Sequence, residues 1–341
     1  MTLRQFILIL LDFTGVNEIF RSVNSNKAII LWYHGICDDN FKMLKGYDER
    51  HIPKSLFRKQ LLYLIGKGYQ FVTMSELTLL LKEKKKLNKT IALTFDDGFR
   101  NVIDNAYPLM KELNAKGCIY LVSNLISEQS LLWTDLIETS VRINKSKKIE
   151  FMFKGEAIQY SLNSKESCES TIKNIKEKLR TIPDHERKDH LKQFDIEKFE
   201  VKDISEEFLV AGWDQIKILD KSILEAGSHT RNHPNCANLV LEEEFESELK
   251  GAKADIENKV GYLIDNFCYP AGSYNNKVID CIKKYGYQSA TSIIPGFNDA
   301  STSLFELQRI PINENFWLFK SMVSGSFFFI SDALQRMKRE R

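Results

Sequence analysis

Two adjacent aspartates end a strand-like run of this chain, and two histidines occur farther along at a spacing of four residues. Asp96 and Asp97 stand in the stretch TFDDG, and His229 and His233 stand in the stretch SHTRNHP. Adjacent strand residues point to opposite faces, so the two carboxylates are not one doubled surface charge. Either motif alone is typical of a polar turn or of surface histidines. Together, each after a predicted strand, they indicate a catalytic site.

A set of one carboxylate and two histidines suits a divalent metal ion and leaves coordination positions open for water and substrate. A metal ion in such a site lowers the pKa of its bound water and polarises a carbonyl group. The reaction also needs a general base beside that water. Two neighbouring aspartates fit this chemistry, because one can hold the metal while the other takes the proton.

The chain alternates strands and helices on both sides of a polar segment, which predicts a parallel sheet or barrel with right-handed crossovers. Strands are predicted at 28–33, 70–73, 90–95, 118–123, 224–229, 264–270 and 287–291. Helices are predicted at 53–68, 75–86 (with Ser75 as N-cap), 101–117, 213–223, 242–260 and 275–286. A third polar stretch, CYPAGSYN from Cys268 to Asn275, also follows a strand. In α/β barrels the catalytic loops follow the carboxyl ends of the strands, where all three stretches would lie.

Three further segments flank or interrupt this pattern. Residues 125–210 are rich in Lys, Glu, Asp and Ser, and are predicted to form an inserted hairpin and exposed helices between the barrel parts 27–124 and 211–315. Residues 1–26 have apolar side chains at helical spacing, which predicts an amphipathic helix. That helix either packs on its own domain or lies in a membrane interface. Residues 316–341 are predicted to form a helical tail with aromatic residues and a basic end.

Composition limits the classes of partner and compartment. The 341 residues are 43% hydrophobic and 28% charged, as in a soluble globular protein, and the net charge of +2 predicts no nucleic-acid partner. The six cysteines form no C-x-x-C pair, which suits a reducing compartment. The apolar run from Phe6 to Leu11 is shorter than a signal-peptide core. We therefore expect a cytoplasmic protein, which would be peripheral at the inner membrane face if the N-terminal helix lies in a membrane interface.

The stretches TFDDG, SHTRNHP and YPAGSYN resemble the first three motifs of the NodB-type polysaccharide deacetylases. These are metal-dependent N- or O-deacetylases of sugars on a distorted (β/α)-barrel, and the resemblance covers 28–124 and 211–315. It implies that Asp97, His229 and His233 bind a divalent metal ion, usually Zn²⁺. It also implies that Asp96 is the general base.

The same resemblance assigns the oxyanion contact to a backbone N–H near Ala271, a role that depends on geometry. Two positions depart from the family pattern, which often has Arg where Cys268 stands and a Leu-x-His segment near the end of the barrel. Here the corresponding stretch, FELQRIPIN, contains Arg309 and no histidine. This resembles a branch in surface-polysaccharide biosynthesis that carries Tyr-His on the first strand, as Tyr33-His34 does.

We therefore predict that His34 lies at the barrel mouth, where it supplies the acid or contacts the substrate, and that Arg309 takes the electrostatic role of the absent arginine. The alternative for His34 is a hydrogen-bonded core histidine. The aromatic candidates for stacking on sugar rings are Trp32, Tyr33, Trp133, Tyr269 and Tyr274. Tyr274 is the strongest of these, and Trp133 fits helix packing equally well. The remaining histidines, predicted to be surface or supporting residues, are His51, His185 and His190.

The resulting prediction is a hydrolase that releases acetate and a free amine from an N-acetylated sugar in a glycan or glycan precursor. The apolar chain ends favour a lipid-linked precursor over a nucleotide-linked one. One alternative is a sugar-binding protein that keeps the metal ligands without turnover, and the missing Arg and His favour it. Another is an esterase for O-acetyl groups or a hydrolase of non-sugar amides, which the same residues could serve.

Overall fold

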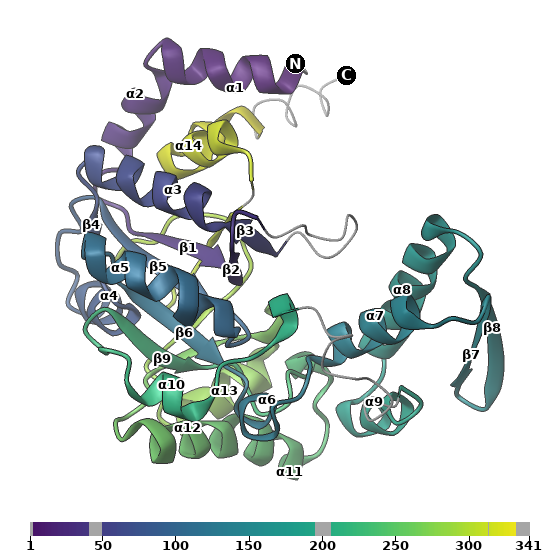
Figure 1. Ribbon diagram of the computed structural model, residues 1–341. Helices are drawn as coiled ribbons and strands as arrows, with labels where there is room; N and C mark the ends of the chain where they lie inside the picture. Colours follow the sequence, from purple (N-terminus) through teal and green to yellow (C-terminus); the bar gives the residue numbers. More distant parts are fainter. Residues whose placement is uncertain (1–2, 41–49, 195–205, 313, 332–341) are drawn as a thin grey trace, which may run out of the picture.

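The computed structural model describes residues 3–40, 50–194, 206–312 and 314–331. Its centre is an eight-stranded sheet of parallel pairings in the order β11-β10-β9-β6-β5-β1-β12, with β4 beside β5 (Figure 1). The strands are β1 (Ile29–Tyr33), β4 (Gln70–Phe71), β5 (Thr90–Phe95), β6 (Gly117–Leu121), β9 (Leu224–Ser228), β10 (Asn266–Cys268), β11 (Ser289–Thr291) and β12 (Ile310–Pro311). Every residue of β5, β6 and β9 is buried, as expected for strands covered on both faces.

The sheet curls into a distorted (β/α)-barrel, as the sequence predicts. Its two edge strands are linked by the segment before β12, where the Ala290 N–H donates to the Leu304 carbonyl at 2.8 Å and the Ser292 N–H donates to the Leu307 carbonyl at 2.8 Å. β12 itself pairs with β1. The segment that precedes Arg309 therefore closes the barrel.

The helices between the strands lie on the outside of the sheet (Figure 1). They are α3 (Lys54–Gly66), α4 (Met74–Lys82), α5 (Tyr107–Leu113), α6 (Ser123–Glu128), α10 (Trp213–Lys217), α11 (Glu242–Phe245), α12 (Ala252–Val260) and α13 (Asn276–Lys284). Short helical turns are η1 (Val102–Ala106), η4 (Glu206–Phe208), η5 (Cys236–Asn238), η6 (Glu246–Gly251) and η7 (Pro270–Gly272). The N-cap of α4 is Thr73, which forms a capping box with Glu76, so Ser75 is not the N-cap.

Two predicted helices are shorter or less regular than expected. The segment 101–117 begins with the π-turn η1 before α5, because Pro108 has no N–H to continue a regular hydrogen-bond ladder. The segment 213–223 is helical only through α10. There the Asp220 carboxylate accepts the Ser222 N–H at 2.9 Å, and this local turn replaces further helix.

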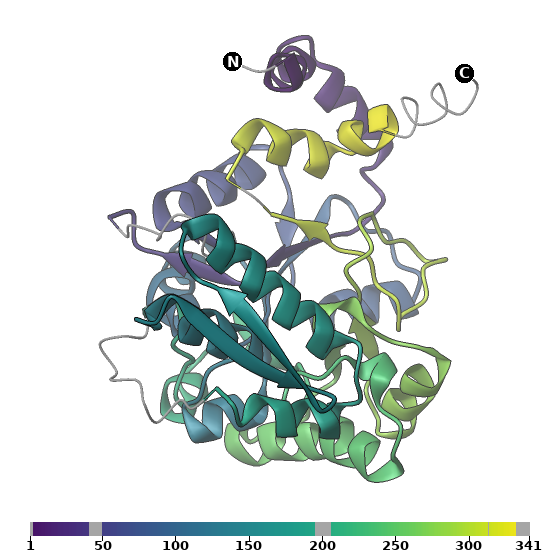
Figure 2. The same ribbon diagram turned by 90° about the vertical axis from the view of Figure 1, so that its right-hand side faces the viewer.

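The two ends of the described chain pack together at one end of the barrel (Figure 2). The predicted N-terminal helix is divided into α1 (Leu3–Phe13) and α2 (Val16–Val23) by Gly15, whose φ of 79° is left-handed. Both helices contact α14 (Phe316–Ser324). The last ten residues of the predicted tail lie outside the described residues.

The segment between the two barrel parts forms a lobe beside the barrel (Figure 1). It contains α7 (Trp133–Ile143), β7 (Lys148–Phe153), β8 (Glu156–Ser161), α8 (Lys165–Arg180) and α9 (Asp184–Leu191). We call these elements the insertion lobe. Its buried apolar side chains form their own cluster, which extends from Trp133 to Phe194. Leu125, Ile126 and Val210 pack in the barrel core instead, so the lobe is shorter than the predicted 125–210.

Candidate active site

The three motifs lie at the carboxyl ends of β5, β9 and β10, with β6 between β5 and β9. Asp96 and Asp97 directly follow β5, His229 directly follows β9, and the YPAG turn follows β10. Asp96, Asp97 and His229 are buried, and His233 is half-buried. The fold therefore brings together two motifs that are more than 130 residues apart in the sequence.

Asp97 and the two histidines converge. The Nε2 atoms of His229 and His233 each lie 3.5 Å from Asp97 Oδ1. The Nδ1–H of His229 donates to the Cys268 carbonyl at 2.8 Å, which leaves the lone pair on Nε2 facing Asp97. Burial lowers the pKa of both histidines, so that both are neutral at physiological pH. Neutral imidazoles with free Nε2 lone pairs are the form that binds a metal.

The donor atoms of Asp97, His229 and His233 fit a divalent metal ion. Two ligands bound at about 2.0–2.1 Å and tetrahedral angles to one Zn²⁺ lie about 3.3–3.5 Å apart, which agrees with the 3.5 Å separations here. A second group, Asp96, His229 and Cys268, is equally compact. It fits a metal poorly, because burial raises the pKa of the Cys268 thiol and His229 Nδ1 already binds a carbonyl.

Asp96 has a different partner from Asp97. The Arg309 guanidinium donates to its two carboxylate oxygens at 2.7 and 2.9 Å, and both side chains are buried. Arg309 Nε also donates to the Ser292 carbonyl at 2.8 Å, and the guanidinium lies 4.8 Å from the Trp32 ring centroid. Burial alone would raise the pKa of Asp96, but the charge of Arg309, aided by His229, holds it well below its usual range. Asp96 is therefore ionised at neutral pH.

His34 lies where β1 ends, next to this carboxylate. The Asp96 N–H donates to the Tyr33 carbonyl at 3.1 Å, so that His34 and Asp96 occupy neighbouring strand ends. When protonated, His34 contributes to lowering the pKa of Asp96. The His34 ring is half-buried and lies 5.3 Å from the Trp32 ring. His34 is thus close to Asp96 and not enclosed in the core.

The YPAG turn has left-handed backbone at Ala271, the residue predicted to supply the oxyanion contact. Ala271 has a φ of 50° and is exposed, and it follows Pro270 in a tight turn. Asp97, Thr230 and His233 also have left-handed φ values, of 76°, 69° and 55°. Such backbone costs about 1–3 kcal/mol per non-glycine residue and often marks functional sites. Strained backbone therefore surrounds the metal ligands and the turn.

The five aromatic candidates for sugar stacking differ in accessibility. Tyr274 is half-buried, stacks on Tyr269 at 4.3 Å and bonds Glu306 through its hydroxyl at 3.2 Å. Tyr269 is 0% exposed and its hydroxyl donates to the Phe305 carbonyl, so its ring supports Tyr274 and does not face a sugar. Tyr33 and Trp133 are also buried, whereas Trp32 is half-buried.

Several residues around the site could not be selected from sequence motifs. Arg50 lies 3.4 Å from Asp97 Oδ2 and 2.5 Å from Asp135 Oδ1, although neither belongs to a recognisable motif. His51 is buried and bonds Asn101 at 2.9 Å, whereas on the insertion lobe His185 is exposed and His190 is half-buried. β2 (Gly35–Cys37) pairs with β3 (His51–Pro53), and the bond from His51 to Asn101 joins this strand pair to the loop after the two aspartates.

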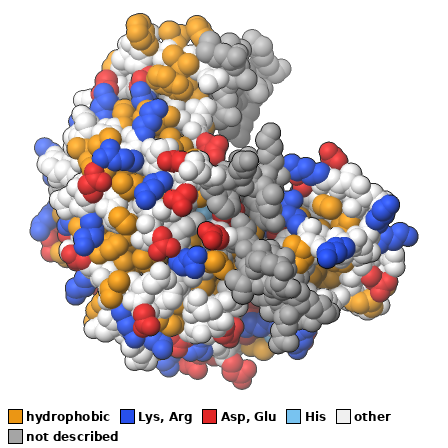
Figure 3. All heavy atoms as spheres, viewed as in Figure 1, with side chains coloured by type: hydrophobic (Ala, Val, Ile, Leu, Met, Phe, Trp, Pro, Cys, Tyr) orange, Lys and Arg blue, Asp and Glu red, His pale blue; other side chains and the backbone are white. Residues whose placement is uncertain are grey.

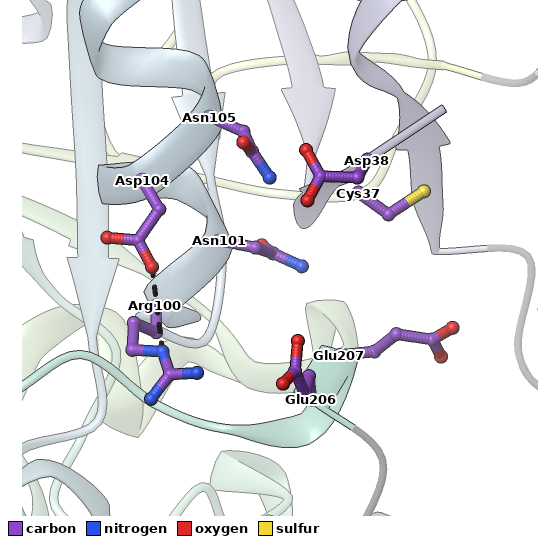
Figure 4. A pocket seen from close by; sticks show the side chains of 8 residues that line it. All are labelled: Cys37, Asp38, Arg100, Asn101, Asp104, Asn105, Glu206 and Glu207. Atoms are coloured by element: carbon purple, nitrogen blue, oxygen red, sulfur yellow. Dashed lines mark ion pairs between the residues drawn. The ribbon is translucent and has the colours of Figure 1, made fainter. Parts of the chain in front are cut away.

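A small cavity of about 100 Å³ lies beside this loop (Figure 4). Its lining combines carboxylates, amides and one arginine: Cys37, Asp38, Arg100, Asn101, Asp104, Asn105, Glu206 and Glu207. Asn101 is turned toward β2 and accepts the Ile36 N–H at 3.2 Å. The cavity is therefore polar, and Asp97, His229 and His233 are not among the residues that line it.

The sequence matches the family model described as polysaccharide deacetylase over residues 83–290. The chain belongs to the polysaccharide deacetylase family. As a polysaccharide deacetylase it is a hydrolase of the amide C–N bond of N-acetylated sugars, as the motif resemblance predicted. The family is generally metal-dependent, and the Asp97, His229 and His233 group offers this member a metal site.

Individual relatives are distant. The Bacillus subtilis protein YxkH, which carries the name of a polysaccharide deacetylase, is 21% identical over 303 residues, which cover 89% of this chain and 75% of YxkH. The Staphylococcus aureus poly-β-1,6-N-acetyl-D-glucosamine N-deacetylase is 23% identical over 165 residues, which cover 45% of this chain and 53% of that enzyme. The match thus spans about half of the staphylococcal deacetylase.

Solved structures share the fold of this polysaccharide deacetylase. The Streptococcus pyogenes deacetylase PplD, in complex with acetate, superposes with a TM-score of 0.58 at 18% identity and covers 87% of this chain and 98% of its own. IcaB from Ammonifex degensii superposes with a TM-score of 0.56 at 15% identity, with coverage of 88% and 97%. At these identities the likeness establishes the barrel fold.

Proposed function

We propose that this polysaccharide deacetylase removes the acetyl group from an N-acetylated amino sugar in a glycan or lipid-linked glycan precursor, with a bound divalent metal ion, Zn²⁺ as first choice. The observation that carries the proposal is that the two adjacent carboxylates, Asp96 and Asp97, have different partners. Asp97 faces two neutral histidines at 3.5 Å, whereas Asp96 faces Arg309 at 2.7 Å. This difference supports a metal-binding role for Asp97 and the role of general base for Asp96.

Asp97, His229 and His233 would hold the metal ion, which when bound polarises the acetamide carbonyl and acidifies water. Asp96, kept ionised by Arg309, accepts a proton from the attacking water as the new C–O bond forms. The backbone near Ala271 donates to the oxyanion of the tetrahedral intermediate. The C–N bond then breaks as the amine takes a proton from His34 or from Asp96, giving acetate and the free amino sugar.

The name of one relative supports a substrate class. The staphylococcal relative is named as a poly-β-1,6-N-acetyl-D-glucosamine N-deacetylase. We therefore expect glycans of N-acetylglucosamine to be the first substrates to test. The half-buried Trp32 and the stacked Tyr274 offer aromatic surface on two sides of the strand ends.

The experiment that tests the proposal measures acetate release from N-acetylglucosamine oligomers, with the metal content of each preparation. Wild type is compared with Asp96→Asn, which keeps the shape of the base and removes its proton affinity. We expect wild type to lose activity on chelation and regain it with Zn²⁺, and the variant to keep its metal and lose turnover. Metal and sugar binding without acetate release from oligomers or lipid-linked precursors would favour the binding-protein alternative.

We also propose that the enzyme acts at an anionic lipid bilayer, contacted through α1, α2 and residues 325–331. Among the described helices none is long and apolar enough to span a membrane. Large apolar side chains are nevertheless exposed on this face: Phe6 (49%), Leu10 (47%), Phe13 (89%), Ile19 (64%), Val23 (74%) and Phe329 (61%). Figure 3 shows hydrophobic atoms gathered over α1.

Charge favours a lipid surface over another protein as the occupant of this face. Residues 332–341, which follow Phe329 in the sequence, contain four basic and two acidic side chains. Apolar side chains beside a basic segment are typical of binding to anionic bilayers.

Co-sedimentation with phosphatidylglycerol vesicles tests this contact. We expect binding that weakens with salt and with Phe13→Ser, but not with Leu263→Ser, an exposed leucine elsewhere on the barrel. A dimer in solution that Phe13→Ser dissociates would assign the face to a second copy of the chain instead.

A further inference from the structure

Two side chains from the first turn of α7, in the insertion lobe, reach the metal ligands of the barrel. Trp133 Nε1–H donates to the backbone carbonyl of His233 at 3.2 Å. Asp135 pairs with Arg50 at 2.5 Å, and the same guanidinium lies 3.4 Å from Asp97 Oδ2. Oδ2 is the carboxylate oxygen on the side away from the histidine Nε2 atoms, which approach Oδ1.

These contacts are enclosed rather than superficial. The exposed fraction is 0% for the Asp135 side chain, 13% for that of Arg50 and 8% for Trp133. The indole is held in turn by Arg187, whose guanidinium lies 4.9 Å from its ring centroid and pairs with the buried Asp184. Hydrogen bonds in such surroundings fix the position of the groups they join more firmly than exposed ones.

Both supported ligands need such restraint. Asp97 and His233 have left-handed backbone, with φ values of 76° and 55°, which L-residues adopt at a cost and keep only when their surroundings hold them. His229, by contrast, directly follows β9 and is oriented from within the barrel by the Cys268 carbonyl. The two ligands held from the insertion lobe are therefore the two on strained backbone.

We propose that α7 of the insertion lobe completes the metal centre, with Trp133, Asp135 and Arg50 as positioning residues for His233 and Asp97. This inference rests on the metal site of the proposed function. The lobe is then part of the active site, because without it the carboxylate and imidazole would lose the groups that orient them toward one ion. Groups that orient metal ligands commonly contribute about 10–100-fold to metal affinity.

The same helix supplies a matched control. Glu138, on the next turn of α7, is also buried, and it pairs with Arg142 at 3.0 Å and Lys176 at 2.8 Å. Both of its partners belong to the insertion lobe. Neutralising Glu138 therefore removes a buried ion pair from α7 without touching the contacts to Asp97.

The test is the Zn²⁺ dissociation constant, measured in the full chain by competition with a chromophoric chelator, without substrate. Asp135→Asn is expected to weaken binding about 10–100-fold, because Arg50 loses its fixed position and its charge near the metal is no longer neutralised. Glu138→Gln is expected to stay within about threefold of wild type. Trp133→Phe, which keeps the packing and removes one N–H, is expected to weaken binding less than Asp135→Asn but more than the control.

A double-mutant cycle separates positioning from simple charge. If Arg50 acted only through its positive charge, its removal would tighten metal binding. If Arg50 positions Asp97, its removal weakens metal binding, and we therefore expect Arg50→Gln to bind Zn²⁺ more weakly than wild type. Combined with Asp135→Asn, it should add little. Wild-type affinity in folded Asp135→Asn and Trp133→Phe would overturn the inference, as would equal losses in Glu138→Gln. If wild type binds Zn²⁺ and releases no acetate, the proposed function fails while this inference stands.

Discussion

Replacement of Arg309 by methionine should destabilise the metal-free protein by about 3–5 kcal/mol at pH 7.5. Arg309 donates to both carboxylate oxygens of Asp96, at 2.7 and 2.9 Å, and both side chains are buried. Removal of one partner of a buried ion pair leaves the other charge uncompensated, which typically costs about 3–5 kcal/mol. This range corresponds to an about 150- to 5,000-fold smaller folding equilibrium constant.

The cost should depend on pH with a definite sign. In wild type the pKa of Asp96 is below its unfolded value, so the pair stabilises the fold above about pH 4 and this contribution is lost in stronger acid. Without Arg309 the burial effect on Asp96 prevails and raises its pKa in the folded state. The folded variant then binds more protons than the unfolded chain between about pH 4 and the raised pKa. Its stability must therefore fall as the pH rises through that window.

Urea unfolding of chelator-treated protein between pH 4.5 and 8 measures this difference. The gap between wild type and Arg309→Met should be small at pH 4.5 and reach its full size near pH 7.5. Addition of Asp96→Asn to the variant should recover most of the stability, because no buried charge is left. A gap that is independent of pH and unchanged by Asp96→Asn would refute the assignment of Arg309 as the partner that keeps Asp96 ionised.

Three further outcomes follow from other parts of the structure. Burial raises the pKa of Glu225 to about 7 from 4.5, so the folded protein binds one more proton than the unfolded chain between these pH values. Glu225→Gln should therefore raise the unfolding free energy by up to about 3 kcal/mol at pH 8 and by almost nothing at pH 4.5, as measured by urea unfolding. Gly117→Ala should lower the unfolding free energy by about 1–3 kcal/mol or more, because the new Cβ would lie 2.2 Å from the Leu93 carbonyl oxygen. An unchanged urea midpoint would contradict that packing. His34→Gln should reduce kcat for acetate release about 10²–10⁴-fold with KM and metal content little changed, whereas an unaltered kcat would leave Asp96 as the proton donor to the amine.

Much of the fold could be predicted because its signals are local. The buried parallel strands are continuous apolar runs, and the helix between residues 242 and 260 keeps one pattern through α11, η6 and α12. The motif residues could be selected because each follows such a strand. Gly15, which divides the N-terminal helix, and Pro108, before which the chain forms a π-turn, act through single backbone positions that an apolar pattern conceals.

The supporting residues of the site could not be predicted for a different reason. Arg50 and Asp135 are 85 residues apart, and only the packing of the insertion lobe against the barrel joins them. Neither stands in a recognisable motif, because an ion pair between distant elements leaves no periodic or spacing signal. The burial of Tyr269 could not be predicted either. Its position in the YPAG motif suggested contact with a sugar, but the structure encloses its side chain.

The closure of the barrel places the arginine of the base late in the chain. Asp96 and Arg309 are separated by 213 residues, and the segment that links the two edge strands ends at that arginine. A ribosome completes Asp97, His229 and His233 well before Arg309 leaves its exit tunnel. The ion pair between Asp96 and Arg309 can therefore form only after nearly all of the barrel sequence has been synthesised. A chain that ends before Arg309 would leave the Asp96 carboxylate without its buried counter-charge.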